Sequence, residues 1–265
     1  MKCYQCGGTE YGIIAEKEDI RFGCYGHDKK VVKCFRCDLV QLFPQWTQEE
    51  LDKLYSEYSQ KEDFKGQKRK VKISKYLTKY ARKQDNILEV GCGQGDNLVY
   101  LRQKGLNVTG IDKELNYAWE DYPDDRKWDM IYAIHLLEHL PDPLDFIRWM
   151  LRTLTKTGRF VLEVPSINDP LLGLKAFQKF YWYPYHLFFY SRKTVRELFR
   201  WCPSLKLSVH LRQEYGILNH LRWLFLGRPG NLNFHIPVLD DIYKFILIRC
   251  GFGDTLVVVG EKCSI

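Results

Sequence analysis

The stretch from Ile87 to Gly95, with the sequence ILEVGCGQG, constrains the fold more than any other part of the chain. An apolar run typical of a buried strand turns directly into a loop with three glycines, and residues 97–104 then have a helical pattern. Glycine has no Cβ, so it can adopt positive φ and let a ligand lie against the backbone N–H groups at a helix start. The stretch therefore predicts a strand, a ligand-binding turn and a helix.

A second predicted strand, residues 106–111, follows one helix length later and ends in Asp112. A carboxylate there can accept hydrogen bonds from ribose hydroxyls. The pattern Glu-x-Gly-x-Gly-x-Gly over residues 89–95, followed by Asp112, resembles the first two motifs of class I S-adenosylmethionine-dependent methyltransferases. It fits the Gly-x-Gly-x-x-Gly dinucleotide fingerprint poorly, since Asp96 stands at the last position.

The resemblance implies an α/β fold, a Rossmann-like methyltransferase sheet with an antiparallel last strand, and S-adenosylmethionine as methyl donor. In that family the glycine loop packs against the methionine part of the donor, and the acid after the second strand holds the ribose. The donor-binding residues that the resemblance implies are Glu89, Gly91, Cys92, Gly93, Gly95 and Asp112.

Length and composition indicate one medium domain with a small extra module. The chain has 265 residues, of which 45% are hydrophobic, and this is enough for a sizeable core. We predict a zinc ribbon at 1–45, a helical linker at 46–84, and a methyltransferase domain at 85–265 with a helical insertion at about 215–250. The start resembles no signal peptide, and no apolar run reaches the length of a membrane span, so we expect a cytoplasmic protein.

Nine cysteines in such a compartment are expected to be reduced thiols or metal ligands. Two CxxC pairs near the start are flanked by short predicted strands at 11–14 and 31–33. Two such knuckles place four thiolates in a tetrahedron, which favours structural zinc over two unrelated reduced pairs. Cys24 and His27, between the pairs, are interpreted as loop residues. The predicted zinc ligands are Cys3, Cys6, Cys34 and Cys37.

The charge distribution argues for a small acceptor rather than nucleic acid. The formal net charge of +7 permits an anionic substrate, but lysines and acidic residues are mixed within the ribbon, so no basic face is predicted there. We therefore favour a scaffold or substrate-lid role for the ribbon. Residues 61–83 predict a basic helix, for which a solvated face is favoured over a phosphate-bearing partner.

The segment after Asp112 departs from the family pattern. Only sixteen residues separate Asp112 from Asp129, which precedes the next predicted strand, whereas methyltransferases usually fit another helix and strand in this interval. We expect residues 116–121 to form an abbreviated third strand, with Asp121 or Glu120 as the acid that meets the adenine amino group.

The segment from His135 to Pro143 resembles the Glu-His-x-x-Asp-Pro segment of methyltransferases that include the ubiquinone-pathway O-methyltransferases. His135, Glu138 and His139 have i, i+3 and i+4 spacing, which one helical turn would place on one side. Three interpretations stay open. They hold a divalent metal, with His186 completing the set; His135 or His139 is a metal-free general base; or Glu138 and His139 fix the loop by hydrogen bonds to the backbone.

Residues 181–191 are the most aromatic stretch and resemble a His-Leu-x-x-Phe-Ser segment that leads over the active site in related methyltransferases. Its rings either stack on an acceptor or form ordinary core. Two apolar helices are expected within 215–250. A substrate lid or homodimer face is favoured for them over a membrane-surface element.

We therefore expect an S-adenosylmethionine-dependent methyltransferase that O-methylates a sugar, a glycan precursor or a hydroxylated small molecule. Candidate catalytic residues are His135, Glu138, His139 and His186. The alternatives are a sugar C-methyltransferase, a zinc-stabilised interaction module with a degenerate donor site, and an RNA methyltransferase. Nucleic acid is the less favoured partner.

Overall fold

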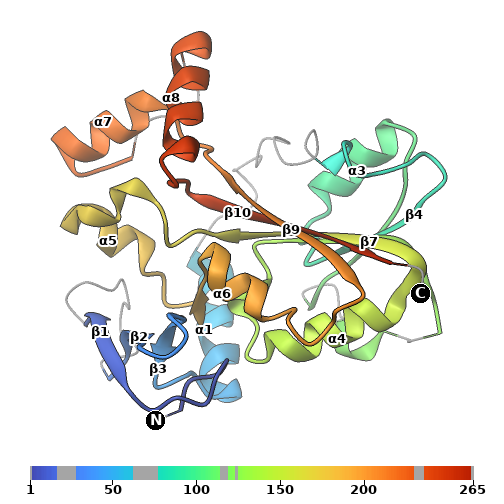
Figure 1. Cartoon of the computed structure of the whole chain (residues 1–265), viewed down its shortest axis with the longest axis horizontal. Helices are drawn as coiled ribbons and strands as arrows, with labels where there is room; N and C mark the ends of the chain where they lie inside the picture. The colour runs from blue at the N-terminus through green and yellow to red at the C-terminus, as the bar shows by residue number, and fades with distance from the viewer. Residues whose placement is uncertain are drawn as a thin grey trace. The chain divides into compact units, whose positions relative to one another are not determined.

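The computed structural model describes residues 2–16, 28–61, 77–113, 119–122, 125–229 and 236–263 (Figure 1). The chain divides into two compact units, each described below by itself. The first contains Met1–Glu49, Val164–Arg200 and Val209–Val257, and the second contains Glu50–Glu163, Trp201–Ser208 and Val258–Ile265. The division predicted from the sequence, at residues 45 and 84, stays a prediction. No helix in the described ranges is long and apolar enough to cross a membrane.

The large sheet has the strand order β5-β4-β6-β7-β10-β9, and its β7-β10-β9 end is antiparallel. Strands β5, β4, β6 and β7 are parallel, with Leu88 opposite both Thr109 and Ile131. Most of their residues are buried, as apolar runs without alternation predict for parallel strands. The strands are β4 (Asn86–Val90), β5 (Asn107–Ile111), β6 (Trp128–Ile134), β7 (Leu154–Pro165), β9 (Leu205–Arg212) and β10 (Thr255–Lys262).

Helix α4 shows how the sequence sets the helices beside these strands. Asp142 caps it by accepting a 3.0 Å hydrogen bond from the Asp145 amide, and Pro143 occupies its first turn. Its apolar face is buried through Phe146 and Met150. The helices that fall mainly in the second unit are α1 (Gln48–Lys61), α3 (Asp96–Gln103) and α4 (Pro143–Thr153), with the short 3₁₀ helices η3 (Trp119–Asp121) and η4 (Leu137–His139).

The abbreviated third strand expected at 116–121 is wrong for its described part. Trp119–Asp121 forms the 3₁₀ helix η3, and β5 has no further neighbour among the described strands of the sheet. The Trp119 ring instead packs on Phe146 at 5.4 Å and on Trp149 at 5.5 Å between ring centroids. This contact with α4 accompanies the 3₁₀ conformation of Trp119–Asp121. Residues 114–118 lie outside the described ranges.

The first unit contains a small antiparallel sheet with the order β1-β2-β3-β8. The hairpin β1–β2 confirms the strands predicted at 11–14 and 31–33. Strand β8 was not predicted, and it pairs with β3 through Val40 opposite Phe189 and Gln41 opposite Phe188. The elements are β1 (Tyr11–Ala15), β2 (Lys30–Cys34), β3 (Val40–Phe43), η5 (Pro170–Gly173), α5 (Lys175–Tyr181), β8 (Phe188–Phe189), α6 (Arg192–Glu197), α7 (Ile217–Leu226) and α8 (Pro237–Arg249).

Candidate functional site

The predicted glycine loop joins β4 to α3. Gly91, Gly93 and Gly95 have φ values of 77°, 49° and 82°, a region that side chains with a Cβ rarely adopt. The Gly95 amide donates to the Cys92 carbonyl at 2.9 Å, and this turn leads directly into α3. A Cβ added to Gly93 would meet no heavy atom within 4 Å, so the loop is open on that side. The loop thus leaves room for a ligand beside its backbone.

Asp112 lies against this loop. Its Oδ2 accepts a 2.7 Å hydrogen bond from the Gly93 amide, and the Ile111 carbonyl accepts from the Gly91 amide at 2.9 Å. The structure therefore brings together the loop and the acid at the end of β5, which the sequence places far apart. Asp121, the other predicted acid, has its backbone in η3, and its side chain lies outside the described part of the chain.

Glu89 is buried beneath the loop. Its carboxylate accepts hydrogen bonds from Asn97 Nδ2 at 2.9 Å and from the Tyr132 hydroxyl at 2.8 Å. Burial raises the pKa of Glu89 to about 7, with the nearby Asp112 charge adding to the rise and the two hydrogen bonds opposing it. Glu89 therefore ties β4 to α3 and β6 from inside the unit.

Cys92 is also buried, at the point where β5 passes under the loop. A Cβ added to Gly110 would come within 2.8 Å of its Sγ. Burial, together with the charges of Glu89 and Asp112, raises the pKa of the Cys92 thiol to about 11, so the thiol stays protonated at neutral pH. The thiol therefore packs as an uncharged group, and the donor-binding role of Cys92 stays a prediction.

His135, Glu138 and His139 meet at one carboxylate. Oε1 of the fully buried Glu138 lies 3.2 Å from His135 Nδ1 and 3.8 Å from His139 Nε2. Both imidazoles are half-buried. The three side chains gather as their spacing predicted, but the expected single helical turn is wrong. Helix η4 begins at Leu137, and His135 precedes it with φ 51° while its amide donates to the Glu163 carbonyl at 2.9 Å.

The left-handed conformation of His135 is a feature that sequence reasoning missed. Residues other than glycine adopt this region uncommonly, although asparagine, aspartate and histidine adopt it more often than the rest, and such residues cluster at functional sites. It turns the chain at the end of β6, so that the imidazole of His135 comes back to Glu138. No periodicity in the sequence signals such a turn.

His186 belongs to the first unit, within the aromatic stretch 181–191. Its ring packs beside Tyr183 and Phe189, each at 5.9 Å between ring centroids. Most of the stretch is core, but Tyr183, Tyr185 and His186 are half-buried. These three are therefore the rings of the stretch that remain accessible to a ligand. The role of His186 in an active site stays a prediction.

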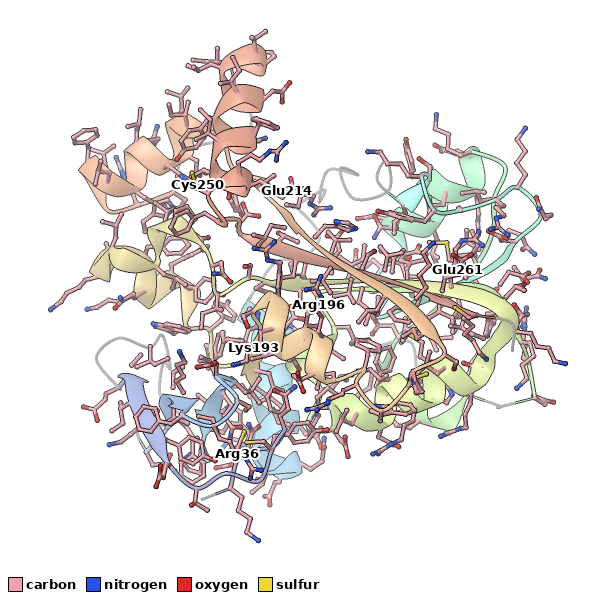
Figure 2. All side chains as sticks on the ribbon, in the orientation of Figure 1. Arg36, Lys193, Arg196, Glu214, Cys250 and Glu261 are labelled. Atoms are coloured by element: carbon pink, nitrogen blue, oxygen red, sulfur yellow. The ribbon has the colours of Figure 1, made fainter. Side chains whose placement is uncertain are left out.

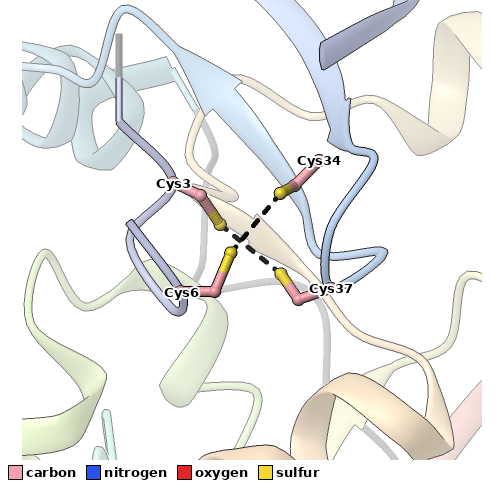
Figure 3. Close-up of side chains that lie close together, drawn as sticks. All are labelled: Cys3, Cys6, Cys34 and Cys37. Carbon is pink, nitrogen blue, oxygen red and sulfur yellow. Dashed lines mark hydrogen bonds between the residues drawn. The ribbon is translucent and has the colours of Figure 1, made fainter. Parts of the chain in front are cut away.

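The two CxxC pairs converge (Figure 3). The four Sγ atoms all lie within 4.8 Å of one another, with 3.5 Å between Cys3 and Cys37 and 3.6 Å between Cys6 and Cys34. Tetrahedral zinc with Zn–S bonds of about 2.3 Å requires sulfur atoms about 3.8 Å apart. The cluster therefore fits the predicted structural zinc. The cluster consists of cysteines alone; Cys24 and His27 lie outside the described ranges.

The two knuckles share one backbone pattern, which explains the convergence. In the first, the Gly7 amide donates to the Cys3 carbonyl and the Cys3 amide to the Gly8 carbonyl, at 2.9 and 2.8 Å. In the second, the amides of Asp38 and Cys34 make the equivalent bonds within their own knuckle. Gly7 and Asp38 both have left-handed φ, of 68° and 67°. These turns aim each pair of thiols to one side of the chain.

The zinc ribbon also holds the aromatic stretch. Besides the β3–β8 pairing, the Trp46 indole N–H donates to the Pro184 carbonyl at 2.8 Å, and the Leu42 amide to the Leu187 carbonyl at 2.9 Å. Lys193 of α6, labelled in Figure 2, forms an ion pair with Asp38 of the second knuckle. Within the first unit the ribbon is therefore a scaffold for residues 184–193.

A family model described as a methyltransferase domain matches residues 45–201. The chain belongs to this methyltransferase family. A crystal structure of a SAM dependent methyltransferase from Archaeoglobus fulgidus aligns with a TM-score of 0.51 and 18% identity, covering 78% of this chain and 99% of that chain. The predicted family and fold class are confirmed.

Two curated relatives of the methyltransferase match parts of the chain. Ajmaline N-methyltransferase from Rauvolfia serpentina is 26% identical over 115 residues, covering 34% of this chain and 39% of that protein. A tRNA U34 carboxymethyltransferase from Colwellia psychrerythraea is 27% identical over 128 residues, covering 40% of this chain and 38% of that protein. The chain thus spans less than two fifths of the length of either relative.

Proposed function

We propose that the protein transfers a methyl group from S-adenosylmethionine to a hydroxyl of a sugar, glycan precursor or other small molecule. The observation that carries the donor part is the open glycine loop bonded to Asp112, with 2.7 Å between the Gly93 amide and Asp112 Oδ2. In this proposal Asp112 exchanges that bond for the ribose hydroxyls, and the loop meets the methionine part of the donor.

Methyl transfer is an in-line displacement at the sulfonium carbon, so the protein chiefly aligns the acceptor and removes its proton. His135 suits that role because a buried carboxylate lies 3.2 Å from its Nδ1. With Nδ1–H donating to Glu138, the ring is held in the tautomer that accepts a proton at Nε2. His139 is the second candidate base, since it faces the same carboxylate. These two candidate bases, His135 and His139, favour hydroxyl acceptors, whose proton must be removed.

The divalent-metal variant of this mechanism uses the same residues. Glu138 Oε1 is near both imidazoles, so an ion held there would supply Lewis-acid chemistry to a substrate hydroxyl. The distinction is experimental. Turnover that is unchanged in EDTA, under conditions in which the cysteine-bound zinc is retained, favours the metal-free base. Turnover restored by added magnesium or manganese favours the metal.

The first test is titration calorimetry of S-adenosylmethionine and S-adenosylhomocysteine into zinc-loaded protein. We expect affinity to fall by at least about tenfold in Gly93→Arg, because the side chain fills the open side of the loop. Gly105→Arg is the matched control, since Gly105 also has positive φ, a Cβ there also meets nothing within 4 Å, and the residue lies outside the loop. Equal donor affinity in the two variants would contradict the assigned donor site.

Product analysis then separates the acceptor classes. An O-methyl ether and a C-methyl branch differ in their NMR shifts, so a screen of sugars and hydroxylated small molecules distinguishes O-methylation from sugar C-methylation. RNA methylation predicts RNA binding that weakens steeply with salt. Absence of donor binding both with and without acceptors would leave the non-catalytic interaction module.

A further inference from the structure

Helices α7 and α8 expose apolar side chains over most of their outer faces. Val238, Phe245 and Ile242 on α8 are 72%, 59% and 53% exposed, and Phe225 on α7 is 76% exposed. On α8 the exposed apolar residues recur at i, i+4 and i+7 or i+8, which places them on one stripe. We define the apolar surface of α7 and α8 as Leu221, Leu224, Phe225, Val238, Leu239, Ile242, Phe245 and Ile246.

The inner faces of the same helices are polar and hydrogen-bonded. Buried Asp240 accepts from the amides of Ile217 at 2.9 Å and Ile236 at 3.0 Å. His220 Nδ1 lies 2.6 Å from the Tyr243 hydroxyl, and its Nε2 lies 3.1 Å from Gln213 Nε2. Turning the apolar stripe inward would break these buried bonds, each of which is costly to leave unmade. The pair is therefore built with its apolar side outward.

Helix α5 fixes α7 in this orientation. Trp223 is the buried aromatic residue of α7, and its ring meets Phe177 and Phe180 of α5 at 5.1 and 5.4 Å between centroids. The three helices lie together at the upper left of Figure 1. Phe180 is itself 42% exposed, so the apolar character continues from α7 onto α5.

The charges around this surface are predominantly positive. Among the described residues of α5, α7 and α8, the carboxylates are Asp240, which is buried and hydrogen-bonded, and Asp241. The basic side chains of these helices and the turn after α7 are Lys175, Lys179, Arg222, Arg228, Lys244 and Arg249. The Arg249 guanidinium lies 5.2 Å from the centre of the Phe245 ring, so charge and apolar surface are adjacent.

We propose that the apolar surface of α7 and α8 docks on an anionic lipid bilayer. Leucine, isoleucine and phenylalanine side chains would enter the acyl boundary, and the surrounding lysines and arginines would meet phosphate headgroups. A second copy of the chain fits less well, because a two-fold contact brings the same basic residues of both copies together. The formal net charge of +7 also opposes self-association and favours an anionic surface.

Vesicle co-sedimentation of the full-length, zinc-loaded protein tests this docking. One set of vesicles is pure phosphatidylcholine, and the other contains equal parts of phosphatidylcholine and phosphatidylglycerol. We expect binding to the anionic vesicles to be at least about tenfold stronger, since each basic residue near the surface adds to the attraction. That preference should shrink as salt is raised.

Two double variants separate the apolar and the basic contributions. Phe225→Gln with Phe245→Gln removes the two large exposed rings without changing the charge, and Arg222→Glu with Arg249→Glu reverses two charges. Each double variant should weaken anionic-vesicle binding by at least about tenfold. Ile13→Glu is the matched control, because Ile13 is 57% exposed on β1, outside this surface, and its binding should stay within about twofold. Retained titration of S-adenosylhomocysteine or an unchanged circular dichroism spectrum shows that each variant is folded.

Other occupants give different results. A concentration-dependent dimer in light scattering that disappears in Phe225→Gln with Phe245→Gln, without vesicle binding by the intact protein, would overturn the proposal in favour of a second copy. Equal binding to both vesicle types, or loss of binding in Ile13→Glu alone, would also overturn it. Binding that needs anionic lipid and both parts of the surface supports it.

Discussion

At the scale of single residues, His135 combines backbone strain with a buried partner. A non-glycine residue with φ 51° carries a conformational cost of order 1 kcal/mol, which the surrounding structure must offset. The 2.9 Å bond from its amide to the Glu163 carbonyl and the 3.2 Å contact of its ring with Glu138 hold it in place. The strained backbone fixes the position of the His135 imidazole at a cost in stability, as the proposed base requires.

The first prediction concerns this base. Asparagine tolerates left-handed backbone, so His135→Asn removes the imidazole while keeping the turn. We expect kcat to fall by about 10²- to 10⁴-fold, as loss of a general base does, with donor affinity in calorimetry unchanged within about threefold. His139→Asn is the matched control and should lower kcat less. A larger loss in His139→Asn than in His135→Asn would assign the base to His139.

The second prediction concerns Glu89, whose pKa of about 7 lies above the ordinary value of 4.5. The folded state therefore holds this proton more tightly, so stability from Glu89 is present below about pH 4.5 and is lost as pH rises through 7. Glu89→Gln removes this titration, so the free energy of unfolding of the variant minus that of the intact protein should be larger at pH 8 than at pH 5, by up to about 3 kcal/mol. Urea unfolding of both proteins at the two pH values measures this. An identical pH dependence in both proteins would show that folding does not raise the pKa of Glu89.

At the scale of elements, the contact of β5 with the loop and α3 depends on one position without a side chain. A Cβ added to Gly110 would lie 2.5 Å from Leu98 Cδ1 and 2.8 Å from Cys92 Sγ. Leu98 and Cys92 are both buried, so neither can move away freely. Gly110 therefore sets how closely β5 approaches the glycine loop.

The third prediction follows from this spacing. Gly110→Ala should lower the free energy of unfolding by about 1–3 kcal/mol, because overpacking displaces buried side chains. It should also weaken donor binding, since Asp112 lies two residues further along. Gly173→Ala, where the added methyl meets nothing within 4 Å, should change neither quantity. Chemical denaturation and calorimetry of the two variants measure both effects, and an unaffected Gly110→Ala protein would contradict the packing argument.

Elements marked by local chemistry were predictable from the sequence. The glycine loop and the two cysteine knuckles are each set by a few adjacent residues, and the structure confirms their local conformations. Strand β8 was not predictable, because two residues inside an aromatic run carry no pattern and owe their strand to pairing with the distant β3. Likewise the turn of Trp119 onto α4 depends on a tertiary contact that overrides local propensity.

At the scale of the whole molecule, the two compact units have different sources of stability. The second unit has a buried parallel sheet, whereas the ribbon in the first is too small to supply a sufficient apolar core by itself. Metal binding to the four thiolates would supply folding free energy directly. Because β8 and Pro184 are bonded to the ribbon, we predict that the order of the aromatic stretch depends on the same metal.

The fourth prediction is that zinc removal separates donor binding from turnover. A thiol-competing chelator should release the metal, loosen the ribbon and shift the fluorescence of the buried Trp46 and Trp182 to longer wavelength. The glycine loop and Asp112 belong to the second unit, whereas the ribbon belongs to the first. Affinity for S-adenosylhomocysteine should therefore change by less than about threefold. Stacking of the aromatic rings on an acceptor, one of the two roles expected for this stretch, requires turnover to fall by about 10²-fold, the usual cost of misplaced acceptor groups.

A variant makes the same test without chelator. Cys37→Ser removes one thiolate from the cluster, whereas Cys263→Ser removes an exposed thiol outside it and serves as the matched control. Only the first should show the fluorescence shift and the loss of turnover. Donor affinity that falls in parallel with turnover would mean that the metal supports the fold of the whole chain. Retained turnover with a loosened ribbon would instead remove the aromatic stretch from the acceptor site and leave the ribbon as a scaffold alone.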